Sequence, residues 1–147
     1  MTDAADAQAR AERAAAAMWA DDAASQALGM TLDEIRPGHA RLTMRVRDDM
    51  VNGHAICHGG FVFALADSAF AFACNSYDKV AVAQACDIVF VAPARLGDVL
   101  VAEADERARY GRNGIYDVTV RRGEELIAEF RGRSREIGAS VTANDPE

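Results

Sequence analysis

The sequence predicts an α+β fold in which a curved antiparallel sheet wraps around one long central helix. Three observations predict it. Residues 59–75 are apolar nearly all round, two strand-like segments precede them, and four strand-like segments follow. A helix that is apolar on every side belongs inside a core. Because a flat sheet covers only one face of such a helix, the sheet must curve, and we expect the uncovered face to pack against another subunit.

The N-terminal segment predicts an extra helix over residues 4–27 that packs on the outside of the fold. Alanine is the strongest helix former, and nothing breaks the run before Gly29. We therefore divide the chain into an N-terminal helical extension over residues 1–27, one domain over residues 28–139 and a polar, frayed tail over residues 140–147.

The strands are predicted from alternation and from turn residues. Residues 40–47 alternate strictly between apolar and polar, which indicates a half-buried strand. Pro37-Gly38-His39 joins it to a strand near residues 30–36. The later strands lie near residues 81–92, 98–109, 114–122 and 125–137, with a hairpin turn at Arg122-Gly123-Glu124 between the last two.

Composition excludes several classes of protein. The net charge of −7 argues against nucleic acid as a partner. No apolar run reaches the roughly 18 residues that a membrane span needs, since Asp67 interrupts the best candidate. The acidic, alanine-rich start is not a signal peptide. Cys57, Cys74 and Cys86 lie in apolar surroundings and predict reduced, buried thiols in a cytoplasmic protein.

Asp67 is the one acid in the apolar helix. A buried lone carboxylate is unfavourable unless it is paired or protonated. Asp67 is therefore either a structural hydrogen-bonding group or a general base or nucleophile whose pKa is set by its surroundings.

Gly59 and Gly60 stand at the expected start of the same helix. Glycines there leave backbone N–H groups uncovered, and the helix dipole adds partial positive charge, so this end can stabilise an oxyanion. The alternative is a loop-to-helix junction that needs unusual dihedral angles.

The two histidines of the loop before the helix suggest a metal site at first sight. His54 and His58 are four residues apart, with Cys57 between them. A zinc site needs three or four ligands, however, and the neighbouring glycines make a continuous helix through both histidines doubtful. We therefore expect no metal, and we interpret His58 as a group that orients a substrate and His54 as a loop residue.

The spacing of the candidate catalytic groups has a consequence for assembly. Gly59 and Asp67 are eight residues apart, which is about 12 Å along a helix at about 1.5 Å per residue. A reacting carbonyl cannot lie within about 3 Å of both. If both act on one group, they must come from different chains, so the spacing predicts a dimer with active sites at its interface.

The pattern N-x5-HGG-x6-D, which begins at Asn52 and ends at Asp67, resembles the signature of hotdog-fold acyl-CoA thioesterases. The segments CHGGFVFALADSAFAFACNS, DIVFVAPARLGD and FRGRSREIG resemble the PaaI group, the phenylacetate-pathway thioesterases. The resemblance extends over roughly residues 25–139. It implies the hotdog fold, dimers that pair into tetramers, and no cofactor, because coenzyme A is part of the substrate.

The resemblance also implies roles for single residues. Asp67 activates water or attacks the thioester carbonyl itself, and the Gly59 N–H polarises that carbonyl, with Gly60 beside it. Asn52 and His58 hold the thioester and the attacking water. Some relatives place a water-orienting hydroxyl on the strand after the helix, where this chain has Ala83-Gln84-Ala85, so that role falls to Ser68 or Gln84.

Coenzyme A carries phosphates, which an acidic protein must meet with a local positive patch. Residues 107–135 contain eight arginines against four acids. We expect phosphate contacts from Arg109, Arg112, Arg131 and Arg133. The alternative for each is a solvated charge on an outer strand face.

The predicted activity is hydrolysis of a (hydroxy)phenylacetyl-CoA or a similar aromatic acyl-CoA to the free acid and coenzyme A. Two alternatives stay open: a hotdog enoyl-CoA hydratase or dehydratase, which would act on the acyl chain without releasing a thiol, and a non-catalytic acyl-CoA-binding module.

Overall fold

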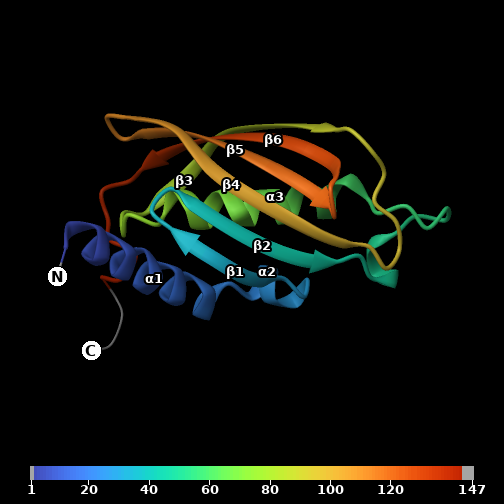
Figure 1. Ribbon diagram of the computed structural model, residues 1–147, viewed down its shortest axis with the longest axis horizontal. Coiled ribbons are helices and arrows are strands. Elements are labelled where there is room, and N and C mark those ends of the chain that lie inside the picture. Colours follow the sequence, from blue (N-terminus) through green and yellow to red (C-terminus); the bar gives the residue numbers. More distant parts are fainter. Residues whose placement is uncertain (1, 144–147) are drawn as a thin grey trace.

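The computed structural model describes residues 2–143 and has one antiparallel sheet of six strands in the order β1-β2-β4-β5-β6-β3. The sheet curves around helix α3 (Figure 1). Helices occupy Asp3–Asp21 (α1), Ala23–Ala27 (α2) and Gly59–Cys74 (α3), with a short 3₁₀ turn at Asp48–Met50 (η1). The strands are Thr31–Arg36 (β1), His39–Arg45 (β2), Ala81–Phe90 (β3), Val99–Tyr110 (β4), Asn113–Arg122 (β5) and Glu125–Glu136 (β6). The predicted fold class is confirmed, and each predicted strand is present with shifts of one or two residues at its ends.

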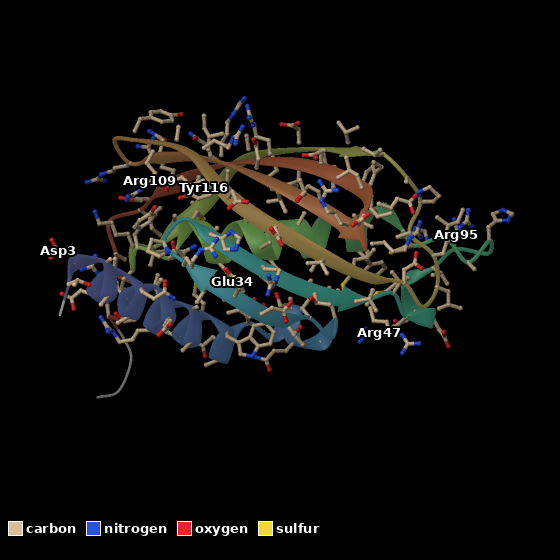
Figure 2. The ribbon with its side chains drawn as sticks, viewed as in Figure 1. Asp3, Glu34, Arg47, Arg95, Arg109 and Tyr116 are labelled. Carbon is tan, nitrogen blue, oxygen red and sulfur yellow. The ribbon has the colours of Figure 1, made fainter. Side chains whose placement is uncertain are left out.

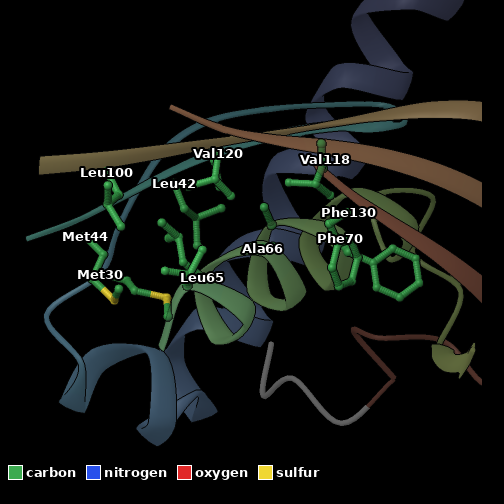
Figure 3. Packing of buried hydrophobic residues seen from close by; sticks show 14 of the residues in the cluster. Met30, Leu42, Met44, Leu65, Ala66, Phe70, Leu100, Val118, Val120 and Phe130 are labelled. Atoms are coloured by element: carbon green, nitrogen blue, oxygen red, sulfur yellow. The ribbon is translucent and has the colours of Figure 1, made fainter. Parts of the chain in front are cut away.

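The core lies between α3 and the concave face of the sheet. Leu65, Ala66 and Phe70 of α3 are fully buried against alternate residues of the strands, including Val118 and Phe130 (Figure 3). Full burial of a side chain of this size stabilises the fold by about 1.5–3 kcal/mol relative to exposure. The apolar face of α3 therefore fixes how the helix sits in the sheet.

Gly132 of β6 lets Phe70 approach the sheet. A Cβ at Gly132 would lie 2.7 Å from the ring of Phe70, which is closer than real Cβ contacts. A larger residue at this position would push α3 away from β6, so this glycine is required by packing rather than by a turn.

The N-terminal extension differs from its prediction, because a single helix over residues 4–27 is wrong. Asp22 ends α1 and begins α2, with φ −86° and ψ 76°, and its Oδ1 accepts a hydrogen bond from the N–H of Ser25 at 3.0 Å. Aspartate is a weak helix former and a strong N-cap, so the chain turns there. The division of the chain at residues 27 and 28 stays a prediction.

Helix α1 runs beside β1, the first edge strand of the sheet (Figure 1). The Nε2 of Gln8 donates to the carbonyl oxygen of Ile35 at 2.8 Å, and the ring of Trp19 packs against Phe72 of α3 with 6.2 Å between centroids. The extension thus shields one sheet edge and also reaches the face of α3 that the sheet leaves uncovered.

The opposite edge strand, β3, is much more open. Val89, Phe90 and Val91, at its end, are 60%, 52% and 53% exposed. A β-bulge between Ala83 and Ala85 interrupts the pairing of β3 with β6, and Gln84 is the extra residue. Bulges re-aim side chains, and here the bulge leaves Gln84 exposed.

The C-terminal segment is anchored as far as it is described, so the prediction of a frayed tail is wrong for Ser140 and Thr142. Asp78 accepts hydrogen bonds from the hydroxyls of both residues and from the N–H of Thr142. Residues 144–147 of the predicted tail lie outside the described part of the chain.

The three cysteines are unpaired thiols. Cys57 and Cys74 are buried, as predicted, whereas Cys86 on β3 is only half-buried. Burial raises the pKa of the Cys74 thiol to about 12, so it carries no charge at neutral pH. Within residues 2–143, none of the helices combines the length and the apolarity needed to cross a membrane.

Candidate active site

Helix α3 begins with two backbone N–H groups that point out of the helix and have no hydrogen-bond partner among residues 2–143. His58 is its N-cap residue, in an extended conformation (φ −59°, ψ 136°), and its side chain makes no capping hydrogen bond. Between residues 2 and 143 no acceptor bonds the N–H of Gly59 or of Gly60. The helix dipole adds partial positive charge to this end, so these groups can bind a carbonyl oxygen that gains negative charge.

The two glycines differ in their surroundings. A Cβ on Gly59 would lie 2.8 Å from Cζ of Phe90, because the exposed Phe90 at the end of β3 covers this glycine. A Cβ on Gly60 would meet nothing within 4 Å. Close packing thus favours glycine at position 59 only, and the Gly60 position is open toward solvent.

Asn52 organises the loop before α3. Its Oδ1 accepts hydrogen bonds from the N–H groups of His54 (2.9 Å) and Ile56 (3.1 Å). These two hydrogen bonds use only the side-chain oxygen of Asn52. Its Nδ2 amide group can therefore donate hydrogen bonds to a ligand. Ala55, in the left-handed region with φ 60°, completes the turn.

Both histidines of this loop are exposed. The substrate-orienting role of His58 stays a prediction. The backbone N–H of His58 donates to the carbonyl of Met50 at 2.8 Å, which fixes the backbone of the residue that precedes α3. Within the described residues, no group of three His, Cys, Asp or Glu side chains is arranged to hold a metal ion.

Asp67 lies in the middle of α3, half-buried in a small cavity between α3 and α2. The cavity measures about 260 Å³, and its lining is mixed, with apolar Leu28 and Met30 beside the polar Asp22 and Ser25. No cation pairs with Asp67 in the described part of the chain. Burial raises the pKa of this carboxyl above its ordinary value, which is the expected environment of a general base rather than of an ion pair.

The raised pKa of Asp67 predicts that the carboxylate destabilises the fold at neutral pH. The folded state binds the proton more tightly than the unfolded state, so this contribution to stability is complete below the unfolded pKa and is lost as pH rises through the folded pKa. We expect the Asp67→Asn variant to have a higher Tm than the unmodified protein by a few degrees at neutral pH.

The measurement is a series of thermal melts at equal protein concentration from about pH 4 to about pH 8. The difference in Tm between variant and unmodified protein should grow with pH. A difference that shrinks as pH rises would mean that Asp67 is stabilised as the anion in the folded protein.

Ser68 and Gln84, the two candidates for orienting water, have different surroundings. Ser68 borders the Asp67 cavity, and its Oγ lies 2.8 Å from Oγ of Ser25. Gln84 stands exposed on the β3 bulge. Sequence analysis did not identify Ser25 as a residue near the candidate site. One signal was present: Asp22 stands three residues before Ser25, which is the spacing of an N-cap. That cap indicates the turn that brings Ser25 to α3.

The four predicted phosphate-binding arginines do not form one cluster. Arg131 makes a bidentate ion pair with Asp117 at 2.7 and 3.0 Å. Arg109 stacks over Tyr77, with Cζ 3.6 Å from the ring centroid, and pairs with Glu136 at 3.4 Å. Arg112 and Arg133 have no ion pair with any residue between 2 and 143.

Arg109 and the loop before α3 lie at opposite ends of the molecule. Figure 2 shows Arg109 near one end of the long axis and Arg95 near the other. Arg95 adjoins the loop, because it forms a β-bridge with Ile56. Sequence analysis missed this exposed arginine, because Arg95 lies outside the arginine-rich residues 107–135. Only the folded structure brings it next to Ile56.

The separation of the two candidate catalytic groups follows from the helix itself. α3 is unbroken from Gly59 to Cys74, so Gly59 and Asp67 are about 12 Å apart along its axis. One chain therefore holds two separate groups of candidate residues: donor N–H groups with Asn52 and His58 at the helix start, and the carboxylate of Asp67 beside Ser68.

Comparison with known proteins identifies the family of this chain. The sequence model of the thioesterase superfamily matches residues 54–129. The acyl-coenzyme A thioesterase PaaI of Escherichia coli (strain K12) is 45% identical over 127 residues, which are 86% of this chain and 91% of that protein.

Solved structures show the same fold. The E. coli PaaI protein from the phenylacetic acid degradation operon has a TM-score of 0.88 at 42% identity, covering 90% of this chain and 97% of that one. The N33D mutant of the phenylacetic acid degradation protein PaaI from Thermus thermophilus has a TM-score of 0.74 at 36% identity, covering 77% of this chain and 97% of that one.

Proposed function

This chain is an enzyme of the thioesterase superfamily and belongs to its PaaI family, and we propose that it hydrolyses (hydroxy)phenylacetyl-CoA or a similar aromatic acyl-CoA. The observation that carries the proposal is the arrangement along α3, with unpaired N–H donors at its start and a half-buried carboxylate eight residues later. The aromatic acyl group is taken from the names of the relatives, which place PaaI proteins in phenylacetic acid degradation.

The proposed reaction uses groups of this chain alone and needs no cofactor. The thioester carbonyl oxygen accepts a hydrogen bond from the Gly59 N–H, which stabilises the negative charge that develops during attack. Asp67 either takes the proton of the attacking water or attacks the carbonyl carbon itself, after which water hydrolyses the acyl-enzyme. In both cases the C–S bond breaks and coenzyme A leaves as the thiolate. The water molecule then supplies the hydroxyl group of the free acid and the proton that converts the thiolate to the thiol.

The remaining site residues hold the substrate in this proposal. Asn52 offers its free amide donors and His58 its imidazole at the start of α3, where Gly60 leaves room for the thioester. Phosphate contacts would come from Arg112 and Arg133, which have no ion pair with any residue between 2 and 143, and from Arg95 beside the loop. Arg109 and Arg131 would have to exchange carboxylate partners for phosphate.

We place the complete site between two chains. β1 is shielded by α1, whereas β3 presents a free strand edge with exposed Val89 and Phe90, so two copies can join their sheets through β3. Asp67 of one chain would then meet the Gly59 N–H of the other. Such dimers would pair into tetramers in the cytoplasm.

A charged residue on β3 is expected to separate the dimer. The Val89→Lys variant places a cation in the proposed interface, which should shift the protein to monomer and lower thiol release by at least tenfold, because neither chain holds a complete site. Light scattering after size exclusion measures the mass.

Val99→Lys, at a valine of β4 that is 50% exposed, is the matched control and should leave mass and activity unchanged. A Val89→Lys variant that stays dimeric and active would refute the β3 interface.

The experiment that tests the function is a thiol-release assay over aromatic and aliphatic acyl-CoAs. We expect the highest kcat/KM with phenylacetyl-type substrates. Loss of enoyl conjugation without release of thiol would indicate a hydratase, and binding without turnover across the whole panel would indicate a binding module.

A further inference from the structure

The short helix α2 closes over the middle of α3, at the point where Asp67 sits. The cavity between the two helices is bordered on the α3 side by Ala64, Asp67 and Ser68, and on the other side by Ala24, Ser25 and Leu28. At about 260 Å³ it lies just below the range of about 300–1,000 Å³ that whole drug-sized ligands occupy. It therefore has room for a compact acyl group but not for coenzyme A.

Side-chain contacts clamp α2 at both ends. Asp22 accepts the N–H of Ser25 at the start, and Nη1 of Arg47 donates to the carbonyl of Ala27 at the end, at 3.0 Å. The N–H of Met30 returns to the carbonyl of Ser25 at 3.0 Å, and Met30 points toward the α3 region of Leu65 (Figure 3). A five-residue helix has little stability of its own, so these contacts set where α2 stands.

The hydroxyls of Ser25 and Ser68 join α2 to α3. Ser25 is only 2% exposed, so its hydroxyl needs a partner, and Oγ of Ser68 supplies one at 2.8 Å. Ser68 follows Asp67 in the same cavity. This hydrogen bond fixes the rotamer of Ser68. The Ser68 hydroxyl can still accept a second hydrogen bond, or donate one if Ser25 is the donor of the pair, so it can bind a molecule in the cavity.

We propose that α2 forms the far wall of the acyl pocket, that its Ala24 and Leu28 limit the size of the acyl group, and that Ser25 is a positioning residue that holds the Ser68 hydroxyl beside Asp67. This inference rests on the proposed thioesterase function. It gives the N-terminal extension a role in substrate selection.

The first test changes the wall. Ala24→Leu adds three carbons at an exposed position of α2 that borders the cavity, and Ala23→Leu adds the same group at an exposed neighbour that does not. Ala24→Leu should lower kcat/KM for phenylacetyl-CoA at least tenfold relative to acetyl-CoA, while Ala23→Leu should keep the ratio of the unmodified enzyme. Leu28→Ala should shift the ratio the other way.

The second test changes the hydroxyl pair. Loss of one hydrogen bond corresponds to a change of about 2- to 12-fold, so Ser25→Ala should lower kcat several-fold at little change in KM. If Ser25 acts through Ser68, the Ser25→Ala/Ser68→Ala double variant should have the kcat of Ser68→Ala alone. A purely structural Ser25 would lower Tm and give additive effects.

The outcomes separate the two hypotheses. If the unmodified enzyme releases no thiol from any acyl-CoA, the proposed function fails and the inference with it. If the enzyme is active but Ala24→Leu and Leu28→Ala both leave the phenylacetyl-to-acetyl ratio unchanged, α2 is not the wall. If the serine variants are additive, Ser25 is not a positioning residue.

Discussion

The Asp67→Asn variant is expected to lose about 10²- to 10⁴-fold in kcat for acyl-CoA hydrolysis while keeping its fold. Asparagine has nearly the same shape but can neither accept the proton of water nor attack the carbonyl. The half-buried position of Asp67 and its lack of a cationic partner within residues 2–143 mean that no ion pair is broken by the change. Thiol release at saturating substrate measures the effect, and circular dichroism checks the fold.

The pH profile adds a second signature of the same group. Asp67 must be ionised to act, and its pKa is raised by burial, so the kcat of the unmodified enzyme should fall on the acid side at a higher pH than an ordinary aspartate would give. The residual activity of Asp67→Asn should lack this fall. Asp6→Asn, at an exposed aspartate on α1, is the matched control and should keep both the rate and the profile. Near-normal turnover by Asp67→Asn would exclude the proposed mechanism.

How much of this protein could be predicted from its sequence depended on whether a signal was local. The apolar character of residues 59–75 and the alternation of the strands are read directly from residue types, and both predicted the elements within one or two residues. The turn in the N-terminal extension had a local signal, Asp22 as an N-cap three residues before Ser25, but the high helix propensity of the surrounding alanines masked it. The contact of Ser25 with Ser68 joins residues far apart in the sequence, so no local signal predicts it.

The candidate site shows the same division. Gly59 and Asp67 could be singled out because their chemistry is unusual for their positions in the sequence, whereas the role of Asn52 was expected only from the resemblance to hotdog thioesterases. Arg109 and Arg131 were chosen by charge alone, and folding supplied them with Glu136 and Asp117 as partners. The register of neighbouring strands decides which charged residues form ion pairs, and amino-acid composition does not predict that register.

Replacing Gly59 with proline is the most direct test of the backbone donor. Proline removes the N–H at the first position of a helix, where it is well tolerated, and His58 already has the extended conformation that a residue before proline favours. We expect Gly59→Pro to lower kcat by about 10²- to 10³-fold. Gly59→Ala places a similar Cβ against Phe90 but keeps the N–H, so it separates crowding from loss of the donor. If the two variants are equally impaired, the N–H is not the catalytic element.

Mixing the two inactive variants then tests where the site lies. If Asp67 of one chain acts with Gly59 of the other, a mixed dimer of Asp67→Asn and Gly59→Pro chains has one site with both groups intact and one with neither. Random reassociation of equal amounts makes about half of the dimers mixed, so thiol release should recover to about one quarter of the unmodified level. Recovery requires that chains exchange, which co-refolding ensures. A mixture no more active than its components would place both groups in one chain, against the roughly 12 Å that the unbroken helix α3 puts between them.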